Sequence, residues 1–198
     1  MCTIAVTGPR PHKFGHDFSY KKPQTLKIRS EMERVIRENN CTELITGMAQ
    51  GVDTIAAMIA VAFQIPFTAA VPFYKQEMLW RNQSKATYYE LLYKATHLVY
   101  VHDDPGFRPD KAQPGYLNTL YQNRNEWMVN KLVNPGDLLL SVWDGSSGGT
   151  KNCVVYAGNK EPRIRNINIH PATLQITQVN NNYESPQPFQ NKATPSLW

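Results

Sequence analysis

The sequence predicts an α/β protein with a mostly parallel central sheet. Short apolar runs rich in β-branched residues alternate with helical patterns, which is typical of strand–helix units. The chain has 198 residues, of which 41% are hydrophobic, so it can build one domain with a packed core. The predicted strands are Thr3–Thr7, Glu43–Thr46, Phe67–Val71, His97–Val101, Asp137–Trp143 and Ile164–Ile169.

The intervening segments predict helices. In Gln24–Asn39 the apolar residues recur at helical spacing, and Gly51–Phe63 is so rich in Ala, Ile and Val that it is expected to be buried on most sides. The other predicted helices are Lys75–Lys94, Thr119–Val133 and one that begins near Gly149 and ends near Gly158.

Two segments do not follow this alternation, and they set the expected domain boundary. Asp103–Gly115 holds three prolines and two glycines and predicts a long loop that could act as a lid or binding loop. Residues 171–198 are rich in Asn, Gln and Pro with almost no charge, which predicts an extended or disordered tail. The domain itself is therefore expected to span residues 1–170.

Composition narrows the class of function. The formal net charge is +5, but Lys and Arg are scattered, so a dense basic stripe for nucleic acid is not expected. The three cysteines form no CxxC pair, so we expect no metal site and no required cofactor. Without an expected signal peptide, a membrane span or a disulfide framework, we expect a cytoplasmic protein with no membrane partner.

The residues Thr7, Gly8 and Arg10 follow directly on the first predicted strand. In open α/β sheets, ligands bind outside the carboxyl ends of the strands, and glycine lets a ligand approach the backbone. Arg10 could meet a phosphate as a forked donor. An ordinary strand–helix turn with a surface arginine explains the same residues equally well.

A second pair of glycines, Gly47 and Gly51, lies between the second strand and its helix, with Asp53 in the first helical turn. Free backbone N–H groups at a helix start favour an anion. Asp53 could pair with ribose hydroxyls or act as a general base, or it could simply complement the helix dipole.

The segment after the third strand offers a place for a base. Phe73 and Trp80 could stack on it, and Gln76 could recognise its polar edge. For Trp80 alone, packing in the core is the preferred interpretation.

Two further candidates, Asn123 and Arg124, lie on the predicted helix 119–133. Arg124 could clamp a phosphate or carboxylate, or it could be an exposed arginine in an ordinary helical ion pair.

The glycine-rich loop after the strand 137–143 is the strongest phosphate candidate. Small residues between a strand and a helix start expose backbone N–H groups to an anion, and a threonine adds a hydroxyl. The loop has neither the Gly-Lys-Ser/Thr ending of a Walker loop nor the Gly-x-Gly-x-x-Gly pattern, so neither an ATPase nor an ordinary NAD site is predicted. Its candidate ligand residues are Asp144, Gly145, Gly148, Gly149, Thr150 and Asn152.

Taken in order, these motifs resemble the SLOG superfamily, most closely its YpsA-like branch. The matching patterns are Thr-Gly-x-Arg-Pro at 7–11, Gly-Met-Ala-x-Gly-Val-Asp at 47–53, Pro-Phe-x-x-Gln-x-x-x-Trp at 72–80, Asn-Arg-Asn-x-x-Met-Val at 123–129 and Val-Trp-Asp-Gly-x-x-Gly-Gly-Thr-x-Asn at 142–152. The resemblance covers roughly residues 3–169. It implies a three-layer Rossmann-like fold that binds nucleotides or molecules derived from them, often as a homodimer or higher homo-oligomer.

Within this superfamily, LOG enzymes cleave the N-glycosidic bond of nucleoside monophosphates. Arg124 is similar to their helical arginine, and Gly149-Thr150 is similar to their Gly-Thr, but Cys153 occupies the position of their glutamate. A carboxylate serves such cleavage as a base or by stabilising an oxocarbenium-like state. Asp53 or Asp144 would have to replace it here.

Three functions follow from the sequence. The first is binding of a nucleotide or an ADP-ribose-like ligand for sensing or sequestration. The second is N-glycosidic hydrolysis or transfer on a nucleotide, with Asp53, Asp144 and Arg124 as the tentative catalytic residues. The third is nucleic-acid binding of the DprA kind, against which the scattered charge argues.

Overall fold

A seven-stranded sheet forms the centre of the computed structural model, which describes residues 1–14, 19–113, 115–160 and 164–179. The strand order is β4-β3-β2-β1-β5-β6-β7, and every neighbouring pair is parallel except β6 and β7. The predicted α/β class with a mostly parallel sheet is confirmed. The strands are β1 (Thr3–Thr7), β2 (Glu43–Thr46), β3 (Phe67–Phe73), β4 (His97–His102), β5 (Leu138–Val142), β6 (Arg165–Ile169) and β7 (Ile176–Val179).

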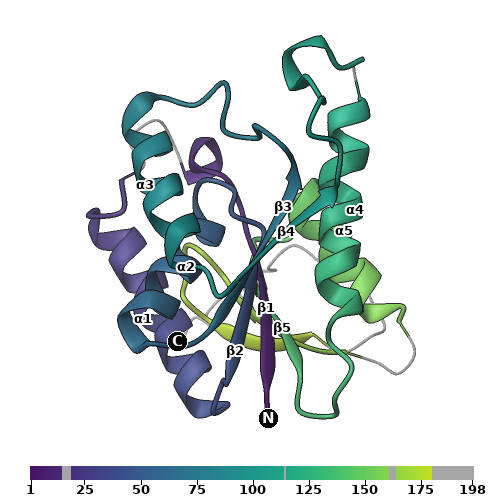
Figure 1. Cartoon of the computed structure of the whole chain (residues 1–198). Helices are drawn as coiled ribbons and strands as arrows, with labels where there is room; N and C mark the ends of the chain where they lie inside the picture. Colours follow the sequence, from purple (N-terminus) through teal and green to yellow (C-terminus); the bar gives the residue numbers. More distant parts are fainter. Residues whose placement is uncertain (15–18, 114, 161–163, 180–198) are drawn as a thin grey trace, which may run out of the picture.

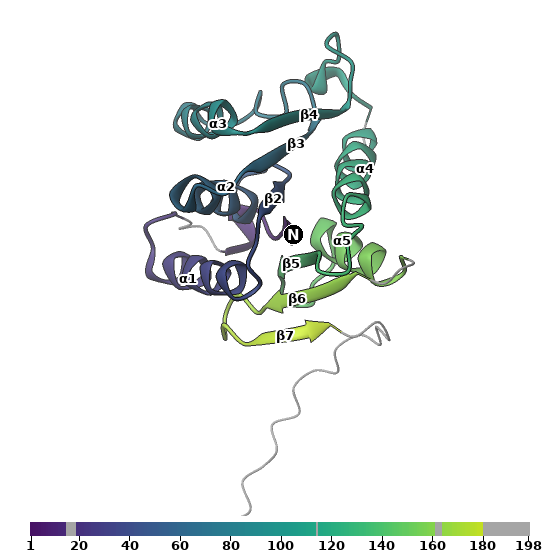
Figure 2. The ribbon, with the colours of Figure 1, turned by 60° about the horizontal axis from the view of Figure 1, so that its bottom comes forward.

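Helices cover both faces of the sheet and make three layers. In Figure 2, α1, α2 and α3 lie on one face, while α4 and α5 lie on the other. None of the helices among the described residues has the length and hydropathy needed to cross a bilayer. The helices are α1 (Pro23–Glu38), α2 (Val52–Phe63), α3 (Asn82–Lys94), α4 (Tyr116–Asn130) and α5 (Gly149–Gly158), with short 3₁₀ turns η1 (Pro11–Phe14) and η2 (Pro109–Lys111).

The central strands β1 and β5 separate two apolar cores. Along β1, Ile4 and Val6 pack into the core on one face of the sheet, whereas Ala5 packs into the core on the other. All five residues of β5 are buried. Parallel strands covered on both faces need such continuous apolar runs, which explains why these two strands could be predicted from the sequence.

The strand order reverses at β1, which is visible at the middle of the sheet in Figure 1. From β1 the chain first builds outward through β2, β3 and β4, and it then returns to the other side of β1 to form β5 and β6. The loops after β1 and β5 therefore leave the sheet in opposite directions. In open α/β sheets this switch point is where ligands bind.

The structure corrects several predicted boundaries. Residues 75–81 form turns rather than helix, and α3 begins only at Asn82. Helix α4 runs from Tyr116 to Asn130, so it starts before and ends before the predicted segment. Apolar periodicity is weak at the ends of a helix, so the sequence does not define the residue at which the helix begins or ends, which explains these shifts.

Strand β7 was missed because Ile176–Val179 was assigned to the C-terminal tail. This strand is short and partly exposed, and its backbone is satisfied by antiparallel pairing with β6. Such an edge strand has no strong apolar signal in the sequence. Described structure thus continues past residue 170, and the remainder of the expected tail, 180–198, lies outside the described residues.

A buried carboxylate joins the start of β1 to the loop before β5. Asp137 Oδ1 accepts the Thr3 N–H at 2.8 Å, and its Oδ2 accepts the N–H groups of Val133 and Asn134 at 2.9 and 2.8 Å. Asp137 is 2% exposed. Its carboxylate therefore holds β1 and β5 together at their amino ends, which lie opposite the loops that follow these strands.

We expect the Asp137→Ala variant to lose about 3 kcal/mol in free energy of unfolding, because three backbone donors lose the buried charged acceptor that joins β1 to the loop before β5. Urea denaturation measures this loss. As a control, Asp110→Ala removes an exposed partner of Arg108 and should have a much smaller effect. Equal losses in the two variants would contradict this role for Asp137.

Candidate functional site

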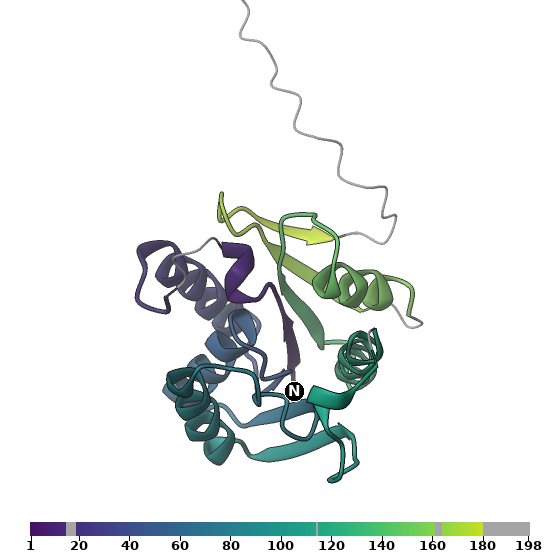
Figure 3. The same cartoon turned by 90° about the horizontal axis from the view of Figure 1, so that it is seen from above.

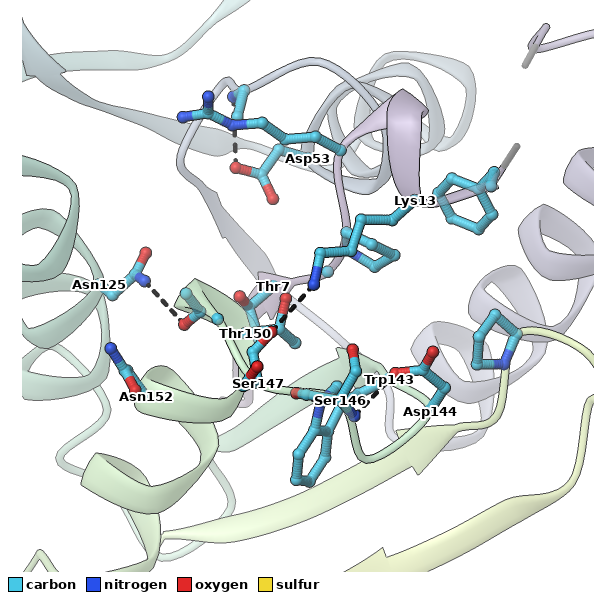
Figure 4. Close-up of a pocket in the computed structure, with 18 of the residues that line it drawn as sticks. Thr7, Lys13, Asp53, Asn125, Trp143, Asp144, Ser146, Ser147, Thr150 and Asn152 are labelled. Carbon is cyan, nitrogen blue, oxygen red and sulfur yellow. Dashed lines mark hydrogen bonds between the residues drawn. The ribbon is translucent and has the colours of Figure 1, made fainter. Parts of the chain in front are cut away.

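A cleft of about 1100 Å³ lies at the carboxyl ends of the central strands. Its walls come from the loop after β1 with η1, the start of α2, helix α4, the β5–α5 loop and the turn between β6 and β7. The cleft is therefore centred on the switch point, where the sequence motifs were expected to meet. Figure 4 shows the side chains that line it.

The glycine-rich loop between β5 and α5 is fixed from several sides. Asp144 Oδ1 accepts the Ser146 N–H at 2.9 Å, and Trp143 Nε1–H donates to the Ser146 carbonyl at 2.7 Å. Lys13 Nζ donates to the Ser147 carbonyl at 2.9 Å, so an ammonium group lies against this loop (Figure 4). These hydrogen bonds therefore give the loop a defined conformation.

Asp144 keeps its charge at neutral pH. Partial burial raises the pKa of this carboxyl, but hydrogen bonds from Ser146 outweigh that effect and lower it below the ordinary value. Since the carboxylate is engaged by its own loop, it acts first as a local cap.

The two helix starts at the cleft differ in how their backbone groups are used. At the start of α2, Ala49 N–H donates to Asp53 Oδ2 at 3.2 Å, Gly51 N–H to the Tyr20 hydroxyl at 3.2 Å, and Val52 N–H to the Pro9 carbonyl at 3.5 Å. The chain therefore occupies the first N–H group of this helix and two backbone N–H groups just before it.

Helix α5 begins after Gly148 and, like α2, has no side-chain cap, but among the described residues none of its first three N–H groups donates to another segment. The first N–H groups of any α-helix have no partner inside the helix. Gly148 has a φ of 134°, a conformation that favours glycine, and Lys13 Nζ lies 3.5 Å from where its Cβ would stand. Of the two helix starts predicted to bind an anion, α5 is the one open to the cleft.

A buried ion pair forms the opposite wall. Arg124 Nη1 donates to Asp53 Oδ2 at 3.1 Å, and each side chain is 7% exposed. Burial raises the pKa of Asp53, while the charge of Arg124 and the Ala49 N–H oppose that rise. Among the described residues, Arg124 Nε is buried without a hydrogen-bond partner. The guanidinium therefore retains an unused donor beside the cleft.

Gly47 is required by this ion pair and not by a ligand. A Cβ on Gly47 would stand 1.1 Å from Arg124 Nη1, so the guanidinium lies directly on the glycine backbone. Any side chain at position 47 would displace Arg124 from Asp53. The sequence singled out the right glycine but for a different reason.

Ten of the predicted ligand residues line the cleft together. They come from four segments that are distant in the sequence and that the fold brings to one edge of the sheet. These residues are Thr7, Gly8, Arg10, Asp53, Arg124, Asp144, Gly148, Gly149, Thr150 and Asn152.

The predicted base-binding group does not reach the cleft. Phe73 is buried in ring contacts with Phe107 and Tyr121, at centroid distances of 5.2 and 5.3 Å. Gln76 is buried and donates to the Met48 carbonyl, and Trp80 packs edge-on against Tyr88. The stacking role predicted for Phe73 and Trp80 is therefore not supported by their positions, although core packing of Trp80 was the preferred alternative.

Three more predicted residues lie outside the lining. Asn123 is exposed on α4, while Gly51 and Gly145 adopt positive φ values of 98° and 90° that shape their turns. The loop 103–115 also contributes no described residue to the cleft. Phe107 instead anchors this loop against Phe73, so it does not cover the cleft in this structure.

Several residues that line the cleft were not predicted from the sequence. Asn125 Nδ2 donates to the Gly149 carbonyl at 3.2 Å and ties α4 to the start of α5. Tyr121 lies under the Arg10 guanidinium at 4.4 Å. Lys13 and His170 also line the cleft. The helical spacing of Tyr121, Arg124 and Asn125 was a usable signal, but no local pattern marks Lys13 or His170.

Cys153 lies in the first turns of α5 and is 1% exposed. Burial raises the pKa of its thiol to about 12, so the group is neutral at physiological pH. It therefore supplies neither a carboxylate nor a thiolate to the cleft.

The fold and the cleft define an α/β protein with a cleft at the switch point of its sheet. The profile of the YpsA family, described as the YspA SLOG family, matches residues 4–175. The chain therefore belongs to this family, which confirms the resemblance found in its motifs.

The chain is also similar to individual proteins. The uncharacterized SPbeta prophage-derived protein YoqJ of Bacillus subtilis is 29% identical over 147 residues, covering 69% of this chain and 84% of that protein. A UPF0398 protein of Bacillus thuringiensis (strain Al Hakam) is 24% identical over 174 residues, covering 84% and 87%. DNA processing protein A (DprA) of Streptococcus pneumoniae has a similar structure, with a TM-score of 0.43 and 17% identity, covering 77% of this chain and 54% of that one.

We expect Arg124→Gln to lower the free energy of unfolding by about 3 kcal/mol at pH 7, because Asp53 is left as an unpaired buried charge. The deficit should shrink as the pH falls from 7 to 5. Without Arg124 the pKa of folded Asp53 rises further above its unfolded value, so folding takes up a proton and acid favours the folded state. Urea denaturation at both pH values measures this change.

The double variant Asp53→Asn/Arg124→Gln is the control, since it carries no buried charge at either position. Its deficit should be independent of pH over this range. A constant deficit in the single variant between pH 7 and pH 5 would show that the pair is not an energetic unit.

Proposed function

We propose that this protein binds a nucleotide or an ADP-ribose-like ligand in the cleft, for sensing or sequestration. The open start of α5, with Lys13 beside it, is the observation that carries the proposal. A phosphate is the ligand group best suited to unpaired helix N–H groups next to an ammonium. The cleft volume of about 1100 Å³ leaves room for the rest of a nucleotide.

The charge balance of the lining supports an anionic ligand. Arg10, Lys13 and Arg124 supply three cations among the described lining residues, against the two carboxylates of Asp53 and Asp144. Both carboxylates accept backbone N–H groups of their own loops. Arg10 lies on a neutral ring, and Lys13 contacts a neutral carbonyl. Cationic charge is thus left over for a phosphate.

Arg124 provides a second point of attachment. Its side chain lines the cleft while its Nη1 is held by Asp53, and the charge of the guanidinium attracts a phosphate.

We expect ADP and ADP-ribose to raise the melting temperature of the protein, since a ligand at about 100 times its Kd adds about 2.7 kcal/mol of stability. Lys13→Ala should weaken ADP binding about fivefold and leave adenosine binding unchanged. Calorimetric titration measures both affinities.

Lys160→Ala is the matched control, because Lys160 also donates to a backbone carbonyl, that of Val129, but lies outside the cleft lining. Its ADP affinity should equal that of the wild type. If no nucleotide changes the melting temperature at millimolar concentration, the proposed ligand class is wrong.

Cleavage of an N-glycosidic bond is the second candidate, and the carboxyl of Asp53 in the cleft wall favours it. Burial raises the pKa of this group, as general acid–base chemistry often requires. Against it, Asp53 is bound to Arg124, and the neutral Cys153 stands where LOG enzymes carry glutamate. Binding without cleavage is therefore the function that the site supports best.

We expect no release of free base when the protein is incubated with nucleoside monophosphates, NAD or ADP-ribose. Chromatography of the reaction mixtures detects such release. Base release that Asp53→Asn or Asp144→Asn abolishes would establish the enzyme instead of the binding protein.

A further inference from the structure

The turn between β6 and β7 forms one end of the cleft. His170, Pro171 and Ala172 line the cleft there, and Gln24 Nε2 donates to the Pro171 carbonyl. Figure 3 shows this turn next to η1 and the beginning of α1. No motif in the sequence pointed to this wall.

The strand order places this turn opposite the Arg124–Asp53 pair. Asp53 follows β2, the open helix α5 follows β5, and His170 follows β6. Since β1 lies between β2 and β5, three strand intervals separate β2 from β6. Neighbouring strands are about 4.8 Å apart, so the cleft extends across about 14 Å of sheet edge. The helix start lies between a cationic end and the His170 end.

The imidazole of His170 has a defined orientation. Its Nδ1 accepts the N–H groups of Ala172 and Thr173 at 3.3 and 3.2 Å. A neutral imidazole that accepts at Nδ1 carries its proton on Nε2. The backbone of the turn is closed by hydrogen bonds from His170 N–H to Gln175 O and from Leu174 N–H to His170 O, at 2.9 and 2.8 Å. His170 is thus a preoriented donor in the cleft wall.

The chemistry of this end fits a neutral flat ring better than a second phosphate. Pro171 and Ala172 present apolar surface at this end of the cleft, with no cation between them. Arg10 and Arg124 belong to the opposite side of the cleft. The residues predicted to hold a base, Phe73 and Trp80, do not line the cleft. At the other aromatic candidate, Tyr121, the Arg10 guanidinium lies over the ring.

We propose that the β6–β7 turn is the nucleobase subsite and that His170 Nε2–H donates a hydrogen bond to a ring nitrogen or carbonyl oxygen of the base. The inference rests on the proposed function, because it assumes that the phosphate lies at the start of α5. His170 follows β6, the direct neighbour of β5, which precedes that helix start, and both segments line the same cleft. Arg124 then faces the far end of the ligand.

Two substitutions distinguish the proposed recognition of the base by His170 Nε2 from the support that Nδ1 gives to the turn. His170→Asn keeps an acceptor near the Nδ1 position, which preserves the turn, but removes the Nε2 donor. His170→Gln keeps an amide donor near the Nε2 position but removes the acceptor for Ala172 and Thr173. The probes are AMP and ribose 5-phosphate, which differ only in the base.

We expect His170→Asn to weaken AMP binding about tenfold, the effect of one lost hydrogen bond, and to leave ribose 5-phosphate binding unchanged. His170→Gln should retain AMP binding better than the Asn variant does. His97→Asn, a change at an exposed histidine of β4 outside the cleft, is the matched control and should bind both ligands as the wild type does. Calorimetric titration gives the affinities.

A measurement on the wild type does not depend on the ligand affinities of the variants. In ¹⁵N NMR of the imidazoles, AMP should shift the His170 Nε2 resonance, and ribose 5-phosphate should not. The chain has five histidines, so the signal is assigned by its absence in one of the two variants.

The outcomes are distinguishable. Equal binding of AMP and ribose 5-phosphate by the wild type would show that His170 does not recognise the base. Loss of binding of both ligands in the Gln variant alone would show the same. In either case the proposed phosphate site is not contradicted. If neither ligand nor any other nucleotide binds the wild type, the proposed function itself fails.

Discussion

The buried pair of Arg124 and Asp53 is the constraint on which the rest of the site depends. It joins α4 to the start of α2 across the switch point, with both side chains almost completely removed from water. Two charges at this depth are tolerated only when each is paired, because desolvation of an isolated charge costs several kcal/mol. Gly47 must lack a side chain for the guanidinium to fit. One interaction therefore fixes the residue at position 47 and the position of two helices.

The same pair decides which helix start remains available. Asp53 accepts the Ala49 N–H, so the carboxylate that neutralises Arg124 also occupies the backbone at α2. Helix α5 has no comparable carboxylate, since Cys153 is neutral and Asp144 turns back onto Ser146. The two loops look equivalent in sequence, both rich in glycine after a strand. Their electrostatic environments differ, which supports a structural role for the α2 loop and the proposed phosphate role for the α5 loop.

Local patterns predicted the fold and about half of the site. Buried parallel strands such as β1 and β5 have continuous apolar runs, and ligand loops follow them directly, so Thr7, Asp144 and Gly149 were found from position alone. Phe73 and Trp80 lie outside the cleft, as core packing of Trp80 had suggested. The sequence alone does not decide such cases, because an aromatic residue after a strand looks the same in sequence whether it faces a ligand or the core. Lys13, Asn125 and His170 were missed because they become lining residues only through pairings distant in sequence.

The distribution of chemistry along the cleft argues for recognition more than for catalysis. A glycosidase needs a carboxylate that is free to act at the sugar, yet each carboxylate here is held by hydrogen bonds within its own wall. Within the described part of the chain, the groups that remain uncommitted are donors: the N–H groups at the start of α5 and the Nε2 of His170. Donors along an edge of about 14 Å match a ligand made largely of acceptors, and phosphates, ribose and bases have that character. The proposed binding of a nucleotide therefore accounts for the lining better than cleavage of one does.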